Sequence, residues 1–187
     1  SAFMLVARIA DGREAELRTL LAGMNAEPGI ADPRNPLIPF GEFESLHFAR
    51  WLILDDDTLA DHAAHGLPTP EFPRQIAFMG DCDGDADAML AELARRAAPG
   101  LRAIFAHCDD FDGHTDLLAW MRTHGVPIAA NYVNWRGRTV RQLREEKALQ
   151  ALLSSRVPRI GVGSGVEAQQ LRKELIALVR EEQRAGG

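Results

Sequence analysis

The sequence predicts an α+β fold of the ferredoxin-like type, in which a four-stranded antiparallel sheet carries two helices on one face. The chain has 187 residues, of which 46% are apolar, and this size and composition suit one domain with a conventional core. Short runs of strand-forming residues alternate with apolar stripes at helical spacing. Through residue 108 the order is strand, helix, strand, strand, helix, strand, which is the split βαβ arrangement. We therefore expect one α+β domain over residues 1–187.

The first half of the predicted core, which spans residues 3–108, contains two strands and one helix. Residues 3–9 are a run of strand formers that ends at the turn pair Asp11-Gly12. Apolar residues from 17 to 24 recur at helical spacing. Four prolines between residues 25 and 44 predict a long loop, and residues 45–54 form the strongest strand of the chain.

The second half of the predicted core repeats the pattern. Residues 75–79 are expected to form the third strand. A turn over residues 80–85 leads into a helix with an apolar stripe, and the pair Pro99-Gly100 is expected to end that helix. Residues 101–107 then predict the fourth strand.

The C-terminal extension, residues 115–182, is expected to follow the order helix, strand, helix, helix. The helix over 115–124 precedes a strand over 127–135. A capping box, Thr139-x-x-Gln142, opens the next helix, and Ser164-x-x-Glu167 opens the last one. We expect this extension to enlarge the cover of the sheet or to mediate association.

Charge and cysteine usage exclude several classes of function. With 27 acidic and 21 basic residues the net charge is −6, which argues against nucleic acid and anionic membranes as partners. No apolar run approaches the 18 residues of a spanning helix. The two cysteines, Cys82 and Cys108, suit a reducing compartment, so we expect a cytoplasmic protein. Two strand spacings would separate them, which predicts two free thiols.

The predicted topology gathers polar side chains at one edge of the sheet. The third and fourth strands run parallel in this arrangement, so their carboxyl ends share an edge, and the second strand begins there. We expect a small-molecule pocket at this edge under the proline-rich loop. Its expected ligand-binding side chains are His47, His107 and Cys108, and its expected catalytic side chain is Asp83. Asp81 and Asp85 are expected at the same edge, as candidate metal ligands together with Asp83.

The strand over residues 45–54 is apolar on both of its faces. Leu46, Phe48, Arg50, Leu52 and Leu54 alternate with the residues of the other face. A sheet covered on both sides explains this pattern, so we expect a homodimer unless residues 115–182 cover the second face. Arg50 and His47 then need partners, either neighbouring polar groups or a bound ligand.

An acidic loop follows the third strand and allows two interpretations. Asp81, Asp83, Asp85 and Asp87 occupy positions 1, 3, 5 and 7 of a stretch with Glu92 at position 12, which is the ligand spacing of a calcium-binding EF-hand loop. The alternative is a turn at Asp83-Gly84 followed by a helix whose first turn is capped by carboxylates.

The same stretch carries a family resemblance. Gly80-Asp81-Cys82-Asp83-Gly84 resembles the G-x-x-D-G signature of dye-decolorising haem peroxidases. The resemblance implies a dimeric α+β barrel over about residues 3–108, a haem cofactor, Asp83 as the acid that accepts a proton from peroxide, and a cation such as Arg50 that stabilises the leaving oxygen.

Three functional interpretations therefore stay open. The first is a small-ligand-binding or accessory domain of unassigned activity. The second is a haem-dependent peroxidase-like oxidoreductase. The third is a structural interaction module, and fold alone does not decide among them.

Overall fold

A computed structural model describes residues 1–55, 58–68, 72–130, 137–156, 172–173 and 176–177. The chain divides into two compact units, residues 1–137 and residues 138–187, and each is described by itself. The expectation that they form a single domain stays a prediction.

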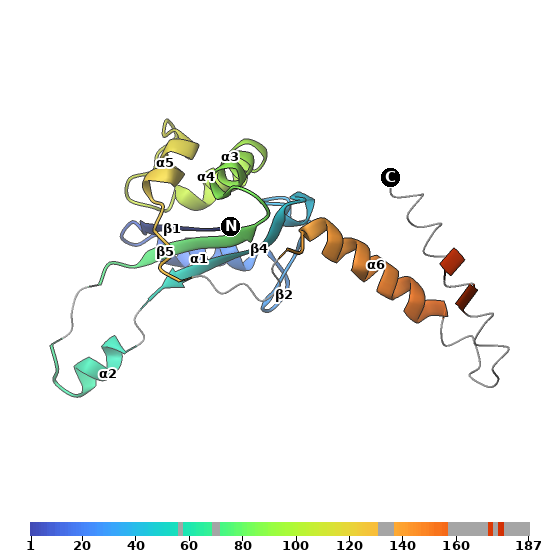
Figure 1. Ribbon diagram of the computed structural model, residues 1–187. Coiled ribbons are helices and arrows are strands. Elements are labelled where there is room, and N and C mark those ends of the chain that lie inside the picture. Colours follow the sequence, from blue (N-terminus) through green and yellow to red (C-terminus); the bar gives the residue numbers. More distant parts are fainter. Residues whose placement is uncertain (56–57, 69–71, 131–136, 157–171, 174–175, 178–187) are drawn as a thin grey trace. The chain divides into compact units, whose positions relative to one another are not determined.

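The first unit is built on a three-stranded antiparallel sheet in the order β1-β5-β4 (Figure 1). These strands are β1 (Ala2–Arg8), β4 (Leu46–Leu54) and β5 (Gln75–Cys82). β4 pairs with β5 along its length, with Trp51 opposite Phe78. The α+β class is thus confirmed, and the sheet is open rather than closed into a barrel.

Helices cover one face of this sheet. In Figure 1, α3, α4 and α5 lie together above the strands. Asp85 and Asp116 cap α3 and α5 by accepting hydrogen bonds from backbone amides at 2.9 Å, as expected for acidic N-cap residues. The helix bounds are α1 (Glu14–Ala22), α3 (Ala86–Arg96), α4 (Ala98–Phe105) and α5 (Leu117–Thr123).

The predicted fourth strand is wrong, because residues 98–105 form helix α4. Pro99 lies in the first turn of this helix, where a proline removes no helical hydrogen bond, so it starts a helix instead of ending one. Leu101, Ile104 and Phe105 are spaced for one helical face, and all three are buried. A Cβ on Gly100 would lie 1.8 Å from the Leu37 carbonyl oxygen, so the helix also needs glycine for close packing.

Two short segments take the place of the missing strand beside β1. The Ala10 amide donates to the His107 carbonyl at 2.8 Å, and the Val126 amide donates to the Met4 carbonyl at 2.8 Å. Isolated bridges join Ile9 to Cys108 and Leu5 to Gly125. The edge of β1 is therefore partly satisfied without a regular fourth strand.

Both long loops contain short regular elements. The proline-rich loop holds a small hairpin of β2 (Asn25–Glu27) and β3 (Ile30–Ala31) and a 3-10 turn, η1 (Phe40–Glu42). Ile38 and Phe43 from this loop are completely buried, so the loop completes the core. The second loop holds helix α2 (Leu59–Ala64).

The second unit contains the predicted helix after the capping box, α6 (Val140–Arg156). The capping box is confirmed: the Thr139 amide donates to Gln142 Oε1 at 2.9 Å, and the Gln142 amide donates to Thr139 Oγ1 at 3.2 Å. Of the predicted strand 127–135, residues 127–130 form no strand, and 131–136 lie outside the described residues. The Ser164 capping box also lies outside them, whereas residues 172–173 and 176–177 are helical.

A β-bulge at His47 sets the faces of β4. Leu46 is opposite Cys82 and Phe48 is opposite Asp81, so His47 is the extra residue. The bulge puts Leu46 in the core, at 6% exposed, and leaves Phe48 on the other face at 46%. The sequence-based assignment of both residues to one face is therefore wrong.

Candidate functional site

Two of the predicted site residues, His47 on β4 and Asp83 just after β5, are in contact. His47 Nε2 lies 2.8 Å from Asp83 Oδ1, and both side chains are about one-quarter exposed. The β4 bulge positions His47, and the Asp83 amide donates to the Ser45 carbonyl at 2.7 Å. The structure thus brings His47 and Asp83 together as expected.

The neighbouring carboxylates do not converge on one point. Asp85 caps α3 through the Ala88 amide, and Asp81 lies on β5 opposite Ala2 and Phe48. Within the described part of the chain, no three His, Cys, Asp or Glu side chains lie close enough together to hold a metal ion. The alternative of a turn followed by a capped helix matches the geometry of Asp85.

His107 and Cys108 lie at the opposite end of β1 from Asp83. Asp81 is opposite Ala2 at one end of the strand, whereas Cys108 bridges to Ile9 at the other. Seven residue steps separate these positions, which is roughly 23 Å along a strand. The expectation that one pocket joins Asp83 to His107 is therefore wrong, because residues 101–107 do not form the parallel strand that would have aligned them.

His107 is held by its own helix. Its Nδ1 donates to the Ala103 and Ile104 carbonyls at 3.0 and 3.1 Å, and Nε2 lies 3.8 Å from Glu16 Oε2. The residue is 8% exposed. These contacts account for a buried histidine as a structural group.

Both cysteines are free, buried thiols, which confirms the prediction of no disulfide. Burial raises the pKa of Cys82, and it raises the pKa of Cys108 to about 12, with Asp110 and Asp109 adding to the effect. Both thiols are therefore protonated at neutral pH and are poor nucleophiles.

Arg50 lies in the middle of β4, opposite Met79, on the face of the sheet that turns away from α4. Asp83 follows Met79 by four residue steps, just beyond the end of β5, which corresponds to roughly 13 Å along an extended chain. Among the described residues Arg50 has no ion-pair partner. The structure does not bring Arg50 and Asp83 together.

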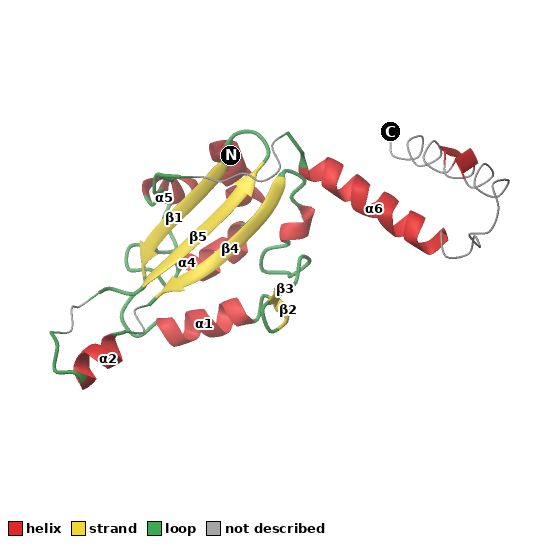
Figure 2. Ribbon diagram, turned by 60° about the horizontal axis from the view of Figure 1, so that its bottom comes forward, coloured by secondary structure: helices red, strands yellow, loops and turns green. Residues whose placement is uncertain are grey.

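We call that face of the sheet the open face. Figure 2 shows the strands from this side, and no helix labelled within residues 1–137 is drawn across them. Phe48 is 46% exposed and Leu54 is 42% exposed, while Met4 and Met79 are half-buried. The open face consists of Ala2, Met4, Val6 and Arg8 of β1, Phe48, Arg50, Leu52 and Leu54 of β4, and Gln75, Ala77, Met79 and Asp81 of β5.

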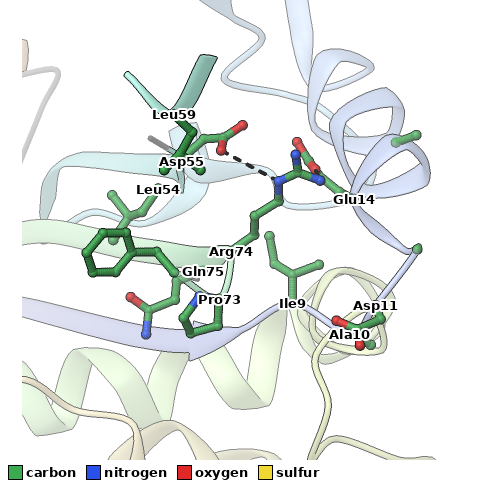
Figure 3. Close-up of a pocket in the computed structure, with 13 residues that line it drawn as sticks. Ile9, Ala10, Asp11, Glu14, Leu54, Asp55, Leu59, Pro73, Arg74 and Gln75 are labelled. Carbon is green, nitrogen blue, oxygen red and sulfur yellow. Dashed lines mark ion pairs between the residues drawn. The ribbon is translucent and has the colours of Figure 1, made fainter. Parts of the chain in front are cut away.

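A cleft of about 840 Å³ lies at the end of the sheet where β1 ends and β5 begins (Figure 3). Sequence reasoning missed it. Four charged side chains beside the cleft form a ring in which acids and arginines alternate. Glu14 and Asp55 each contact both Arg18 and Arg74. Arg18 Nε lies 2.6 Å from Glu14 Oε1, and Arg18 Nη2 lies 3.3 Å from Asp55 Oδ2. We call these four residues the ion-pair ring.

The sequence did carry a signal for this cleft. Antiparallel pairing puts the end of β1, the end of β4 and the start of β5 at the same end of the sheet. Asp55 directly follows β4 and Arg74 directly precedes β5, so the strand order brings these two ring residues together. Glu14 and Arg18 lie on α1, and their position depends on the packing of that helix.

Comparisons with known proteins do not assign a family or a function to this chain. Among the described residues, no helix combines the length and the apolar character needed to cross a membrane. No protein-family model matches the chain, and comparisons with curated proteins and with solved structures find no match.

Proposed function

We propose that this chain is a self-associating interaction module, which pairs with a second copy through the open face. The observation that carries the proposal is the exposure of Phe48 and Leu54 on a sheet face that no described helix of residues 1–137 covers. Large apolar side chains gathered on one face are typical of interaction sites, whereas single exposed ones are ordinary.

The size of the open face suits a dimer. Three strands of about eight residues, with residues 124–128 beside β1, span roughly 25 by 19 Å at usual strand spacing. This is roughly 500 Å² in projection, and side chains raise the accessible area above the projection, toward the about 800 Å² that a standard interface covers on each partner. Val126 and Ile128, which are 38% and 39% exposed, extend the apolar surface beyond β1.

The charges on the open face favour a second copy as the occupant. Asp81 is an anion and Arg50 is a cation, and neither has an ion-pair partner among the described residues. A two-fold interface brings the same patch of both copies together, so the patch must complement itself. A patch with one unpaired cation and one unpaired anion meets this condition, since each copy can offer its Arg50 to the other copy's Asp81.

Light scattering of the full chain tests the proposal. We expect a molar mass of twice 20.6 kDa at tens of micromolar. Met79→Lys puts a charge at the centre of the open face, where a dimer would bury it, so we expect a monomer. Phe48→Lys is a second variant at a more exposed position.

Ile30→Lys is the matched control, because Ile30 is 58% exposed on the β2–β3 hairpin, outside the open face. It should leave the dimer intact. A parent chain that is monomeric, as it would be if its own residues 138–187 covered the face, contradicts the proposal. So does a dimer that survives both lysine substitutions on the open face in folded variants.

A further inference from the structure

Strand β4 forms an edge of the sheet. In Figure 2, β4 lies at the side of the sheet opposite β1, with β5 between them. Among the described helices and strands, only β5 runs alongside β4. The backbone amides and carbonyls of β4 that point away from β5 therefore face no described strand.

The hydrogen bonds of β5 show which backbone groups of β4 point outward. Ser1 and Cys82 exchange both of their backbone hydrogen bonds, at 2.8 and 2.7 Å, so the backbone of Cys82 faces β1. The next amide, that of Asp83, donates to the Ser45 carbonyl and so faces the side of β4. Backbone groups alternate in direction along an antiparallel strand. The odd-numbered residues of β5 therefore bond to β4, and they lie opposite its even-numbered residues.

The outward backbone groups of β4 belong to Ala49, Trp51 and Ile53. Together these residues present three amides and three carbonyls along the edge. Among the described residues, none outside β4 bonds to these groups. The opposite edge of the sheet differs, because the His124 carbonyl and the Val126 amide bond to β1. A long edge with unbonded backbone groups is a surface to which another strand can add.

The sequence of β4 does little to prevent such pairing. Edge strands of native proteins are often protected by proline, by lysine or by a bulge within the strand. From residue 48 to residue 54, β4 has no proline and no lysine, and its bulge precedes this stretch. Trp51 is only half-buried although its ring stacks on Phe78, so an added strand would remove more of this large residue from water.

The residue pattern of β4 suits a second copy of the same strand. Two copies can pair antiparallel about a two-fold axis, and Trp51 is the central residue of the stretch 48–54. An axis at Trp51 puts Ala49 of each copy opposite Ile53 of the other, so all the outward amides and carbonyls are bonded. It also puts Arg50 opposite Leu52. An axis at Arg50 would bring two guanidinium groups face to face, which is unfavourable.

We propose that β4 pairs antiparallel with β4 of a second copy, which joins two three-stranded sheets into one sheet of six strands. This contact goes beyond the proposed pairing through the open face, because it uses the backbone of Ala49, Trp51 and Ile53, which do not belong to that face. One pair of strands buries less surface than a standard interface, so we expect a dissociation constant on the order of hundreds of micromolar. At tens of micromolar the open face alone then determines the molar mass.

Amide hydrogen exchange by NMR tests the proposal on the full chain with Met79→Lys, which is expected to block the open face. Samples at about 20 µM and about 1 mM are compared. The amides of Ala49, Trp51 and Ile53 should exchange roughly twofold to threefold more slowly at the higher concentration, because pairing covers them in most chains. The even-numbered amides of β4 should not change, since they already donate to β5. The molar mass should rise from 20.6 kDa toward twice that value.

A proline on the edge, with a matched control, tests the register. Ala49→Pro removes one outward amide from each copy and no hydrogen bond of the sheet itself. Added to Met79→Lys, it should weaken association by about fivefold or more. Ala2→Pro is the matched control, because the Ala2 amide also points away from β5, at the opposite edge of the sheet. It should leave association unchanged.

Three results would overturn the proposal: a molar mass that stays at one chain up to about 1 mM, association without slower exchange of the three outward amides, or unchanged association in a folded Ala49→Pro chain. In the first case the edge is left for a strand of another protein. The open face is judged separately, by the parent chain at tens of micromolar. A parent that is monomeric there but pairs through β4 at higher concentration refutes only the open face. A parent dimer whose Met79→Lys variant never associates refutes only the edge.

Discussion

The two faces of the sheet are made by alternate residues of the same strands, yet they differ in how they are covered. On the core face, Phe78 is 1% exposed and stacks on Trp51 with ring centroids 4.0 Å apart. One residue further along β5, Met79 is half-buried on the open face between Met4 and Arg50. Both faces carry residues that favour strands. The faces differ in whether helices and loops pack against them.

An apolar strand face can therefore belong to an interface as well as to a core. The core face meets α4 and the proline-rich loop, which together bury Ile104, Ile38 and Phe43 completely. The open face has no such layer within the described residues of the first unit. We therefore expect perturbations of the core face to cost folding free energy, and perturbations of the open face to cost association.

The largest expected effect comes from truncating the two phenylalanines that represent the two faces. Phe78→Ala should lower the unfolding free energy by about 3–5 kcal/mol, because it leaves a cavity beneath Trp51. Phe48→Ala should cost less than about 1 kcal/mol, since Phe48 is already 46% exposed. Urea denaturation in the Met79→Lys background, which we expect to be monomeric, checks both values. Equal costs would remove the distinction between the faces.

A smaller loss of unfolding free energy is expected where the proline-rich loop packs against α4. Gly100→Ala would put a Cβ 1.8 Å from the Leu37 carbonyl oxygen, so the loop must move. We expect a loss of about 1–3 kcal/mol, even though alanine favours a helix more than glycine does. Gly113→Ala is the control, because no atom lies within 4 Å of its added Cβ. A neutral Gly100→Ala would show that the loop does not seal the core face tightly.

The smallest effect concerns the buried thiols. Cys82 lies on β5 at the core face, and the pKa of Cys108 is raised to about 12 by burial. A group whose folded pKa is raised stabilises the fold fully below its unfolded pKa, about 8.5, and this stability is lost as pH rises toward the folded value. We expect the unfolding free energy to fall by up to about 1.4 kcal/mol per pH unit above that point for Cys108.

Urea denaturation between neutral pH and pH values above the ordinary range of a thiol checks this effect, with Cys108→Ala as the variant that lacks it. A parent and a variant with the same pH dependence would contradict burial of this thiol. The folded parent should also resist thiol reagents at neutral pH until it unfolds, because the protonated thiol is not the nucleophile.

Most of the sheet could be predicted from the sequence, and the misses have physical causes. Alternation of apolar residues and the acidic N-caps located β1, β4, β5 and α3 within a few residues. The pair Pro99-Gly100 predicts a helix stop, but proline also begins helices, and Gly100 is required by its contact with Leu37. That contact is between segments 63 residues apart, so no local pattern reports it.

The candidate site was harder to predict, because it depends on which ends of the strands meet. His47 and Asp83 were correctly expected to lie close together, since both follow from the pairing of β4 with β5. His107 was misplaced because its position depended on the wrong fourth strand. The β4 bulge at His47 was also missed, since a bulge has no signature in hydrophobic alternation alone.

The five methionines allow the most direct test of whether the open face is an interface. Met4 and Met79 lie on the open face, whereas Met24, Met89 and Met121 are buried in the core. An equal mixture of chains with and without ¹³C-methyl methionine, recorded with isotope filtering, reports contacts between copies only. We expect intermolecular signals from the methyl groups of Met4 and Met79 and none from the three core methionines. The absence of intermolecular signals from Met4 and Met79 would contradict pairing through the open face.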